Sequence, residues 1–410
     1  SGQDGNMILA NGEKAALELG DGCELSYAAG SSPCCASAWF GAILVLNGGK
    51  TAAGAYIGLD CNFYPAVSYP LISVPKALTG DVHLLLKMIG TTPVAQGIGN
   101  YQLTQADCDR LKVNPESTVS LYMGQRDKYD GNFELHLDPA ASFQIKLRPK
   151  NFTPPTSGNI DVTNMTDVVA QITIRAALEA GHTDLKLTGE LSKIGIGGQW
   201  GTFANNTQIT TCDLTEVTGW GTTPTLPELA FKDCTKLQEV TLPDGVQVIG
   251  EYAFIRCAAL TTVNLSQVTR IDEYAFWECT SLTALTLDNV TTIDHDAFYG
   301  CTGLETLKIP KCTWFGNYIV TGCKALTRIE ATAAGNFDIS DGRSSIEHTA
   351  VFHNRTAHSG DNAFDPAKCD LVLNPDKYEN GGAVPTASAN NEWTVAQHGG
   401  LMKWKSITPP

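Results

Sequence analysis

Apolar positions recur at a fixed spacing in the second half of the chain. Five segments begin with an apolar pair, reach a Cys and a Leu, and close on alternating apolar residues: AFKDCTKLQEVTL, AFIRCAALTTVNL, AFWECTSLTALTL, AFYGCTGLETLKI and a divergent fifth, IVTGCKALTRIEA. Their cysteines, Cys234, Cys257, Cys279, Cys301 and Cys323, mark a period of about 22 residues. The closing alternation predicts one short strand per copy, and the fixed period predicts a solenoid.

A second apolar pair precedes each new copy, as in Val246 and Ile249 or Val268 and Ile271. Each coil therefore turns apolar residues inward twice and has two walls. A single coil would leave half of its apolar edge in water, so stacking on its neighbours is what stabilises it. Because parallel strands lie about 4.8 Å apart, five coils make a slab only ~25 Å long.

The outward positions of the predicted strands are polar and rich in hydroxyl groups. Together with two aromatic residues that follow the repeat Phe, they form the candidate binding surface: Thr262, Asn264, Thr283, Thr286, Thr306, Lys308, Arg328, Trp277 and Tyr299. Aromatic rings in a row along a stack bind sugars by stacking or anchor proteins. The alternative is that Trp277 and Tyr299 pack one coil against the next.

The flanking sequence predicts two domains that differ in kind. Residues 160–410 form a capped repeat domain, with regular repeats at about 226–330 and a helical cap at Val168–Ala180, where the spacing is helical. Residues 149–159, which contain adjacent prolines, form a linker. Residues 1–148 carry short apolar or alternating runs separated by turn residues, which predicts an antiparallel β-sandwich. The predicted fold class is therefore mainly β.

The repeated string A-F-x-x-C-x-x-L-x-x-V-x-L resembles the BspA-like leucine-rich repeats of surface proteins from Gram-negative gut and oral anaerobes. The resemblance implies a solenoid with a binding role, in most cases as an adhesin, and none of the motif positions is catalytic in that family. The segment FELHLDPAASFQIKLRP resembles the strand pair of fimbrillin-type domains, which have a transthyretin-like fold. That second resemblance implies a fimbrillin-like domain at residues 1–148.

Charge and hydropathy exclude some partners. The net charge of -15 leaves no basic face for nucleic acid, and no apolar stretch approaches the ~20 residues that span a bilayer. The chain opens on SGQDGN without Met or an apolar leader, so we expect a signal segment to have been removed. The resemblance implies a lipid-modified Cys upstream, which would anchor the protein at the outer membrane and place it on the cell surface.

Motifs for metal, phosphate or catalysis are weak throughout. The five repeat cysteines predict buried free thiols, and the other eight of the 13 cysteines show no C-x-x-C spacing. Gly49-Lys50-Thr51 lacks the upstream Gly of a phosphate-binding loop. His348, His353 and His358 recur every five residues, a spacing that suits neither helix nor strand. No G-x-S-x-G motif is present. We expect no cofactor, no metal and no enzymatic activity.

The sequence therefore predicts a cell-surface adhesin or protein-interaction module that uses the repeat face. Its expected partner is a host or bacterial surface protein. Two alternatives stay open: a fimbrial minor or tip subunit, and a glycan-binding surface lipoprotein.

Overall fold

The computed structural model describes residues 8–11, 16–20, 23–25, 34–39, 43–53, 55–60, 72–89, 94–113, 117–120, 127–128, 133–138, 144–198, 201–316, 318–332, 368–372, 392–394, 401–403 and 406–408. The chain divides into two compact units. The first comprises residues 1–154 with 168–172, and the second comprises residues 155–167 with 173–410.

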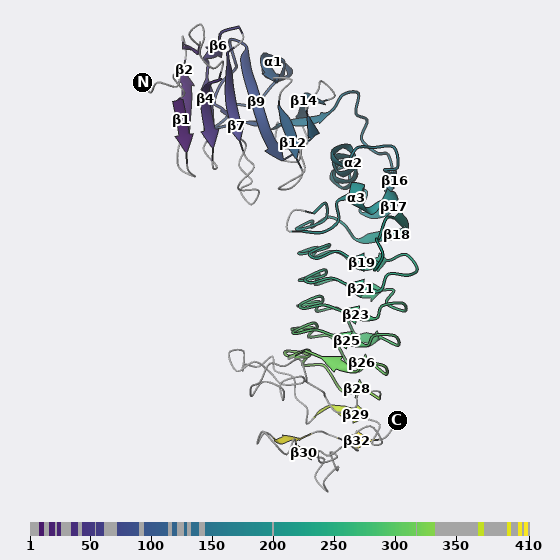
Figure 1. Cartoon of the computed structure of the whole chain (residues 1–410). Helices are drawn as coiled ribbons and strands as arrows, with labels where there is room; N and C mark the ends of the chain where they lie inside the picture. Colours follow the sequence, from purple (N-terminus) through teal and green to yellow (C-terminus); the bar gives the residue numbers. More distant parts are fainter. Residues whose placement is uncertain are drawn as a thin grey trace. The chain divides into compact units, whose positions relative to one another are not determined.

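The strands of the first unit form two main sheets, and from β7 to β10 successive strands alternate between them (Figure 1). One sheet contains β1 (Ile8–Asn11), β4 (Cys34–Trp39), β7 (Tyr56–Asp60), β9 (Val82–Ile89), β12 (Thr118–Ser120) and β13 (Asp127–Lys128), with β11 (Leu111–Val113) also paired to β9. The other contains β14 (Phe133–Asp138), β15 (Gln144–Pro149), β10 (Ala95–Gly97), β8 (Ile72–Val74), β5 (Ile43–Asn47) and β2 (Ala16–Gly20). A small pair joins β3 (Glu24–Leu25) to β6 (Lys50–Thr51).

The prediction of an antiparallel sandwich is wrong for most of this unit. Strands β1, β4, β7, β9 and β12 pair in parallel, as do β2, β5, β8 and β10. The chain reaches each parallel neighbour by crossing to the other sheet, so this unit is also a coil. Short alternating runs with turns fit either strand direction, and the sequence pattern alone does not choose between them.

Among the described residues of this unit, antiparallel strand pairs lie towards its end, and a single antiparallel bridge joins Gly20 to Gly48. Strands β14 and β15 form the predicted hairpin-like pair, with Phe133 opposite Pro149 and Leu135 opposite Leu147. The other antiparallel pairs are β10 with β15 and β12 with β13. The FELHL and FQIKLRP segments thus pair as the fimbrillin resemblance implied, but the parallel sheets around them give the fimbrillin-like domain no support.

One apolar cluster fills the space between the two sheets of the first unit. It includes Leu46 of β5, Ile57 of β7 and Leu84 of β9, all fully buried. Helix α1 (Gln105–Arg110) adds Cys108 to the cluster, and the side chain of Thr104 caps its amino-terminal end. The buried carboxylate of Asp107 accepts hydrogen bonds of 2.8 Å from the backbone N–H groups of Leu78 and Thr104. These contacts fix the helix to the loop that follows β8.

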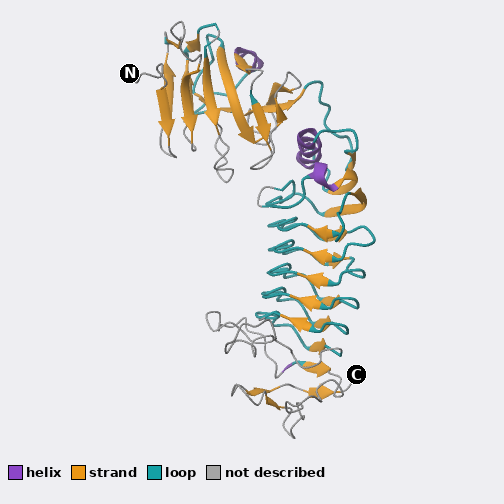
Figure 2. Ribbon diagram, viewed as in Figure 1, coloured by secondary structure: helices purple, strands orange, loops and turns teal. Residues whose placement is uncertain are grey.

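The second unit is a stack of coils with two walls, as the sequence predicts (Figure 2). The first wall is built from β16 (Asn159–Asp161), β17 (Asp184–Glu190), β18 (Thr211–Thr218), β20 (Glu239–Thr241) and β22 (Thr262–Val263), and from a second sheet of β24 (Ala284–Thr286), β26 (Thr306–Lys308), β28 (Arg328–Glu330), β29 (Asp370–Val372) and β32 (Ser406–Thr408). The second wall contains β19 (Thr225–Leu226), β21 (Val248–Ile249), β23 (Arg270–Ile271), β25 (Thr292–Ile293) and β27 (Trp314–Phe315). All these pairings are parallel.

The remaining elements are two helices and a strand pair, and residues 168–172 of the first of these helices belong to the first unit. Helix α2 (Asp167–Glu179) lies where the helical spacing predicts a helix, and α3 (Leu191–Ile194) follows β17. Strands β30 (Glu392–Thr394) and β31 (Leu401–Lys403) form an antiparallel pair. Among the described helices, none has the length and apolar character needed to cross a membrane. The role of α2 as a cap, and the boundaries of the two domains and the linker, stay predictions.

A row of stacked rings runs through the core of the second unit. Phe203, Phe231, Phe254, Phe276 and Phe298 are fully buried, and neighbouring ring centroids lie 5.2 to 5.7 Å apart. Burial of one such side chain stabilises the fold by roughly 1.5 to 3 kcal/mol, and each ring is covered by the rings of the adjacent coils. The stack therefore depends on neighbouring coils rather than on any coil alone.

The repeat cysteines lie beside this row as buried thiols, which confirms the prediction for them. Each donates to the carbonyl oxygen of a Phe in the preceding coil: Cys234 to Phe203, Cys257 to Phe231, Cys279 to Phe254, Cys301 to Phe276 and Cys323 to Phe298, over 2.9 to 3.1 Å. A small side chain with a donor fits this position. The Phe carbonyl that it meets is buried and accepts the thiol as a second donor, as Phe254 does beside the N–H of Cys257 at 3.0 Å.

Each regular coil bends twice through the left-handed backbone region. One bend lies just before the repeat Ala, at Leu229, Tyr252, Tyr274, Asp296 and Tyr318, and the other just before the repeat Cys, at Asp233, Arg256, Glu278, Gly300 and Gly322. Backbone N–H groups there reach the next coil, as from Phe254 to the carbonyl oxygen of Ala275 at 2.8 Å. The bends hold the Ala-Phe segment as a tight loop between the walls.

Candidate binding surface

Strands β24, β26 and β28 present two outward rows of side chains in register. Ala284, Thr306 and Arg328 are neighbours in one row, and Thr286, Lys308 and Glu330 are neighbours in the other. The residues between them, Leu285, Leu307 and Ile329, are buried. Since side chains alternate across a strand, burying the central apolar residue directs both of its neighbours outward. We call these six outward positions the polar wall.

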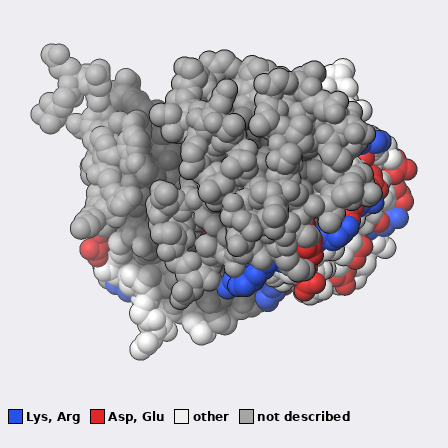
Figure 3. Space-filling view, turned by 90° about the horizontal axis from the view of Figure 1, so that it is seen from below, with Lys and Arg blue, Asp and Glu red and all other residues white. Residues whose placement is uncertain are grey.

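The charged groups of the polar wall pair with nearby acids. Lys308 Nζ lies 3.6 Å from an Asp288 carboxylate oxygen, and Arg328 Nε lies 2.7 Å from a carboxylate oxygen of Glu330. Both basic side chains stay nearly half exposed. Acidic and basic groups also intermingle on the described part of the surface seen in Figure 3. Exposed pairs of this kind are worth about 0 to 1 kcal/mol, so a partner can exchange them at little cost.

The other predicted strand-face residues are arranged differently. Thr262 lies on β22 and Asn264 just beyond it, in the neighbouring sheet of the first wall, and Thr283 precedes β24 with an exposed side chain. The amide of Asn264 is engaged on both sides, since it accepts from Leu242 N–H at 2.6 Å and donates to Leu242 C=O at 2.9 Å. Asn264 is therefore a structural link between two coils. Of the predicted surface residues, the structure brings four together on the polar wall: Thr286, Thr306, Lys308 and Arg328.

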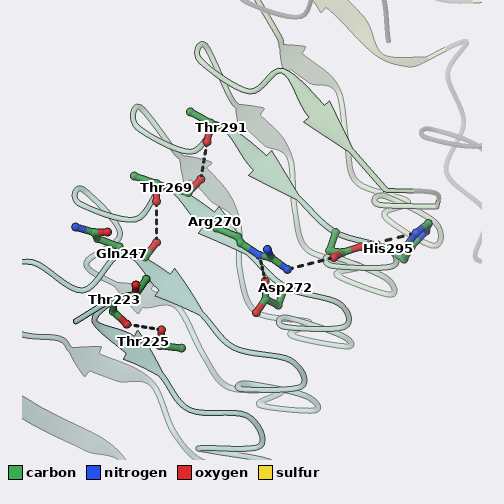
Figure 4. A network of polar contacts seen from close by, with 9 residues as sticks. Thr223, Thr225, Gln247, Thr269, Arg270, Asp272, Thr291 and His295 are labelled. Atoms are coloured by element: carbon green, nitrogen blue, oxygen red, sulfur yellow. Dashed lines mark hydrogen bonds and ion pairs between the residues drawn. The ribbon is translucent and has the colours of Figure 1, made fainter. Parts of the chain in front are cut away.

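Many threonine hydroxyls of the coils are used internally. Thr269 donates to the Gln247 carbonyl oxygen at 3.2 Å, and Thr291 donates to the Thr269 carbonyl oxygen at 3.1 Å (Figure 4). Thr261, Thr280 and Thr327 make the same kind of bond to the preceding coil. A hydroxyl-rich sequence therefore overstates how many hydroxyls are available to a partner, and the sequence reasoning did not separate the two groups.

The predicted aromatic row forms a continuous ladder. The ring of Trp277 lies 4.0 Å from that of Tyr299 and 4.9 Å from that of Tyr274, which stacks on Tyr252 at 4.8 Å between centroids. Tyr299 is only 8% exposed, whereas Tyr252, Tyr274 and Trp277 are partly exposed. The rings thus do pack coil against coil, as the alternative held. We call these four residues the aromatic edge.

The second wall carries a polar network that the sequence reasoning missed. Arg270 on β23 pairs closely with Asp272, and its Nη2 lies 3.8 Å from Asp294 in the next coil (Figure 4). His295 Nε2 lies 3.8 Å from the same Asp294 carboxylate, and its ring meets that of Trp314 edge-on at 6.3 Å. The signal in the sequence would have been the register, which brings residues about 22 positions apart side by side.

The titratable groups of the repeats favour packing over chemistry. Burial raises the pKa of the Cys234 and Cys301 thiols to about 12, so neither forms a thiolate nucleophile near neutral pH. Across the described residues, no group of three or more His, Cys, Asp and Glu side chains could hold a metal ion. The predicted His348, His353 and His358 loop lies outside the described residues.

Comparison with known proteins identifies the repeat. Residues 202–327 match, in six copies, the family model described as the BspA type leucine-rich repeat region, which confirms the resemblance for this part of the chain. The sixth copy begins earlier than the predicted start at about 226. In it, Phe203 holds the repeat Phe position and Asn206 stands where the later copies have Cys. No curated protein matches the chain.

Solved structures with leucine-rich repeats are similar at low identity. They include a leucine-rich repeat protein of T. pallidum (24% identity, 30% of this chain and 52% of that one, TM-score 0.24), a leucine-rich cell surface protein from Faecalibacterium prausnitzii (23%, 50% and 54%, 0.28) and a leucine-rich repeat protein from Bacteroides ovatus (17%, 74% and 67%, 0.31). The chain spans about half the length of the first two. These TM-scores are too low to support an inference about function.

Proposed function

We propose that this protein is a non-enzymatic, cell-surface protein-interaction module that binds its partner through the polar wall. The observation that carries the proposal is the register of β24, β26 and β28, which aligns hydroxyl, ammonium, guanidinium and carboxylate groups on one face. The apolar side chains between them are buried, so the strands that carry the wall are fixed by the core.

The chemistry of the polar wall suits a protein partner. Protein interfaces are polar at the rim and combine hydrogen bonds with a few anchoring side chains, among which Arg is enriched. Arg328 and Lys308 offer exposed donors, Glu330 offers acceptors, and Thr286 and Thr306 offer both. Residues 202–327 match the BspA type leucine-rich repeat. The resemblance implies an adhesin role in most members, and we extend that role to this chain, with a host or bacterial surface protein as the partner.

Two further elements complete the proposal. We place the protein at the outer membrane through a lipid anchor upstream of residue 1, by resemblance to the same family. The parallel sheets of the first unit give no support to a fimbrillin-like domain, so the fimbrial alternative is not the function proposed for this chain. Glycan binding is kept as an outcome of the test below.

The test is a binding screen of the full chain against host matrix proteins, bacterial surface proteins and a glycan array. A T306A/K308A/R328A variant is compared with a T313A/K311A/R270A variant, which removes the same three side-chain types elsewhere on the coils. We expect the first variant to lose at least tenfold in affinity for the protein that binds, and the second to stay within threefold. Binding to glycans alone, or equal losses in both variants, would overturn the proposal.

A further inference from the structure

We infer that the aromatic edge is a second interaction surface, and that it takes a protein segment rich in Lys or Arg. The surface lies on the Ala-Phe loops of the coils, away from the strands of the polar wall. The inference therefore does not depend on the function proposed for that wall.

The first argument is the backbone position of two of its rings. Tyr252 and Tyr274 have φ angles of 55° and 56°, in the left-handed region that disfavours residues with a large side chain. Leu229 holds the equivalent position one coil earlier, also at positive φ, so packing at this position does not require an aromatic ring. The left-handed bend is thus part of the repeat, whereas the rings at Tyr252 and Tyr274 are not required by it.

The second argument is a column of carboxylates beside the rings. Glu228, Glu251 and Glu273 hold one position in three successive coils, two residues before the repeat Ala. Among the described residues, none of the three makes a salt bridge. Arg256, the basic residue of the neighbouring bend, is already paired with Asp233, with an Nη2 to Oδ2 distance of 2.9 Å.

The carboxylates and the rings belong to one surface. Burial and then the charges of Glu273 and Glu228 raise the pKa of Glu251, as do Asp272 and Asp294. Burial and then Glu251, Glu273 and Asp296 raise the pKa of the Tyr252 hydroxyl. Glu251 and Glu273 directly precede Tyr252 and Tyr274 in the chain, and the Tyr252 N–H donates to the Glu273 carbonyl oxygen at 3.0 Å, so the acidic column and the rings lie on the same loops.

A cationic segment matches both parts of this surface. The rings stack on one another, so a Lys or Arg side chain would lay its apolar stem along their exposed edges and bring its charge to the carboxylates. A neutral sugar would leave the like-charged carboxylates unrelieved. An acidic segment would be repelled by a chain of net charge -15.

The experiment measures calorimetric binding of hexalysine to the full chain at low and high salt, with hexaserine as the uncharged probe. E251Q/E273Q removes two charges with little change of shape. Y252L/Y274L removes the rings but uses a residue that the repeat already holds at Leu229. The control, E239Q/E305Q, also removes two exposed charges. Glu239 lies on β20 of the first wall, and Glu305 directly precedes β26.

We expect hexalysine to bind and hexaserine not to bind. Both edge variants should weaken hexalysine binding about tenfold, while the control variant should change it less than threefold. Circular dichroism checks that each variant is folded. Equal losses in the control would mean that the peptide responds to net charge alone, and unchanged affinity in Y252L/Y274L would mean that the rings take no part. Either result overturns the inference, as does the absence of hexalysine binding.

Discussion

The thiol of Cys279 donates a hydrogen bond of 3.1 Å to the carbonyl oxygen of Phe254, one coil earlier. The same bond recurs between successive coils, from Cys234 to Cys323. The cysteine row therefore joins the coils through the backbone beside the stacked phenylalanines, and its role is structural.

Removing one thiol should weaken the stack. In Cys279→Ala, the buried Phe254 carbonyl loses one of its two donors and keeps the Cys257 N–H at 3.0 Å, so the loss should be about 0.5 to 1.5 kcal/mol in the free energy of unfolding measured in urea. Cys279→Ser keeps a donor and should cost less. Cys23→Ala, at an exposed position, should stay within about 0.5 kcal/mol of the parent protein. Equal stability of all three variants would contradict the structural role.

Thiol reactivity should separate exposed from buried cysteines. Alkylation by iodoacetamide at pH 8, followed peptide by peptide with mass spectrometry, should label Cys23 quickly and leave Cys234 and Cys301 unmodified in the folded protein. The reason is burial, which blocks access and raises the pKa of both buried thiols to about 12. Labelling of all three cysteines at similar rates without denaturant would contradict the burial of the repeat cysteines.

Substitution of a phenylalanine in the middle of the row should lower the free energy of unfolding strongly. Phe276 lies between Phe254 at 5.2 Å and Phe298 at 5.7 Å, so Phe276→Ala should cost about 3 to 5 kcal/mol through lost burial and an unfilled cavity. Phe276→Leu should recover a large part of this loss. Urea unfolding gives the size of both effects, and proteolysis should cut the Ala variant first in the adjacent coils. A cost below 1 kcal/mol for Ala would be inconsistent with this packing.

Glycine at a left-handed bend should stabilise the protein. Glu278 has φ of 56° at the position where the next two coils have Gly300 and Gly322. A non-glycine residue there costs about 1 to 2 kcal/mol, and the extra freedom of glycine in the unfolded chain returns about half of this. Glu278→Gly should therefore raise the free energy of unfolding by about 0.5 to 1 kcal/mol. Ala284→Gly, on a strand, should lower it, and a loss in both would refute the argument.

The acidic column should make stability depend on pH. Burial and then the neighbouring acids raise the pKa of Glu251 in the folded state above its ordinary 4.5, so folding favours its protonated form. That contribution is present at pH below 4.5 and is lost as the pH rises through the folded pKa. Glu251→Gln, which cannot ionise, should therefore unfold at a higher temperature than the parent protein at pH 7, and the gap should close at pH 4. A constant gap would contradict the raised pKa.

The sequence reveals the repeat region because every coil needs the same inward residues at the same places. The first coil escaped detection because Asn206 and Ile209 replace the Cys and Leu of later copies. In the first unit, Leu9 pairs with Ser37, and Ser37 pairs with Gly58. The sequence separation between paired residues therefore differs from one strand pair to the next. Coils of unequal length leave no fixed period, so their parallel order could not be predicted.

The candidate surface was partly predictable for a similar reason. Strand parity alone sends Thr306, Lys308 and Arg328 to one face, and in the structure the register of β26 and β28 places them on one face. Hydrogen bonds between coils were not visible in the sequence, which is why Asn264 entered the predicted surface although its amide binds Leu242. Tyr299 entered it although its ring is covered.

Photo-crosslinking tests the central claim most directly, because it reports which wall contacts a partner. A photoreactive residue replaces Thr306 on the polar wall or, as the control, Thr292 on β25 of the second wall, in the full chain mixed with the protein captured in the screen. The account predicts a crosslinked product for position 306 and little or none for position 292. Crosslinking at 292 with none at 306 would contradict the assignment of the polar wall as the binding surface.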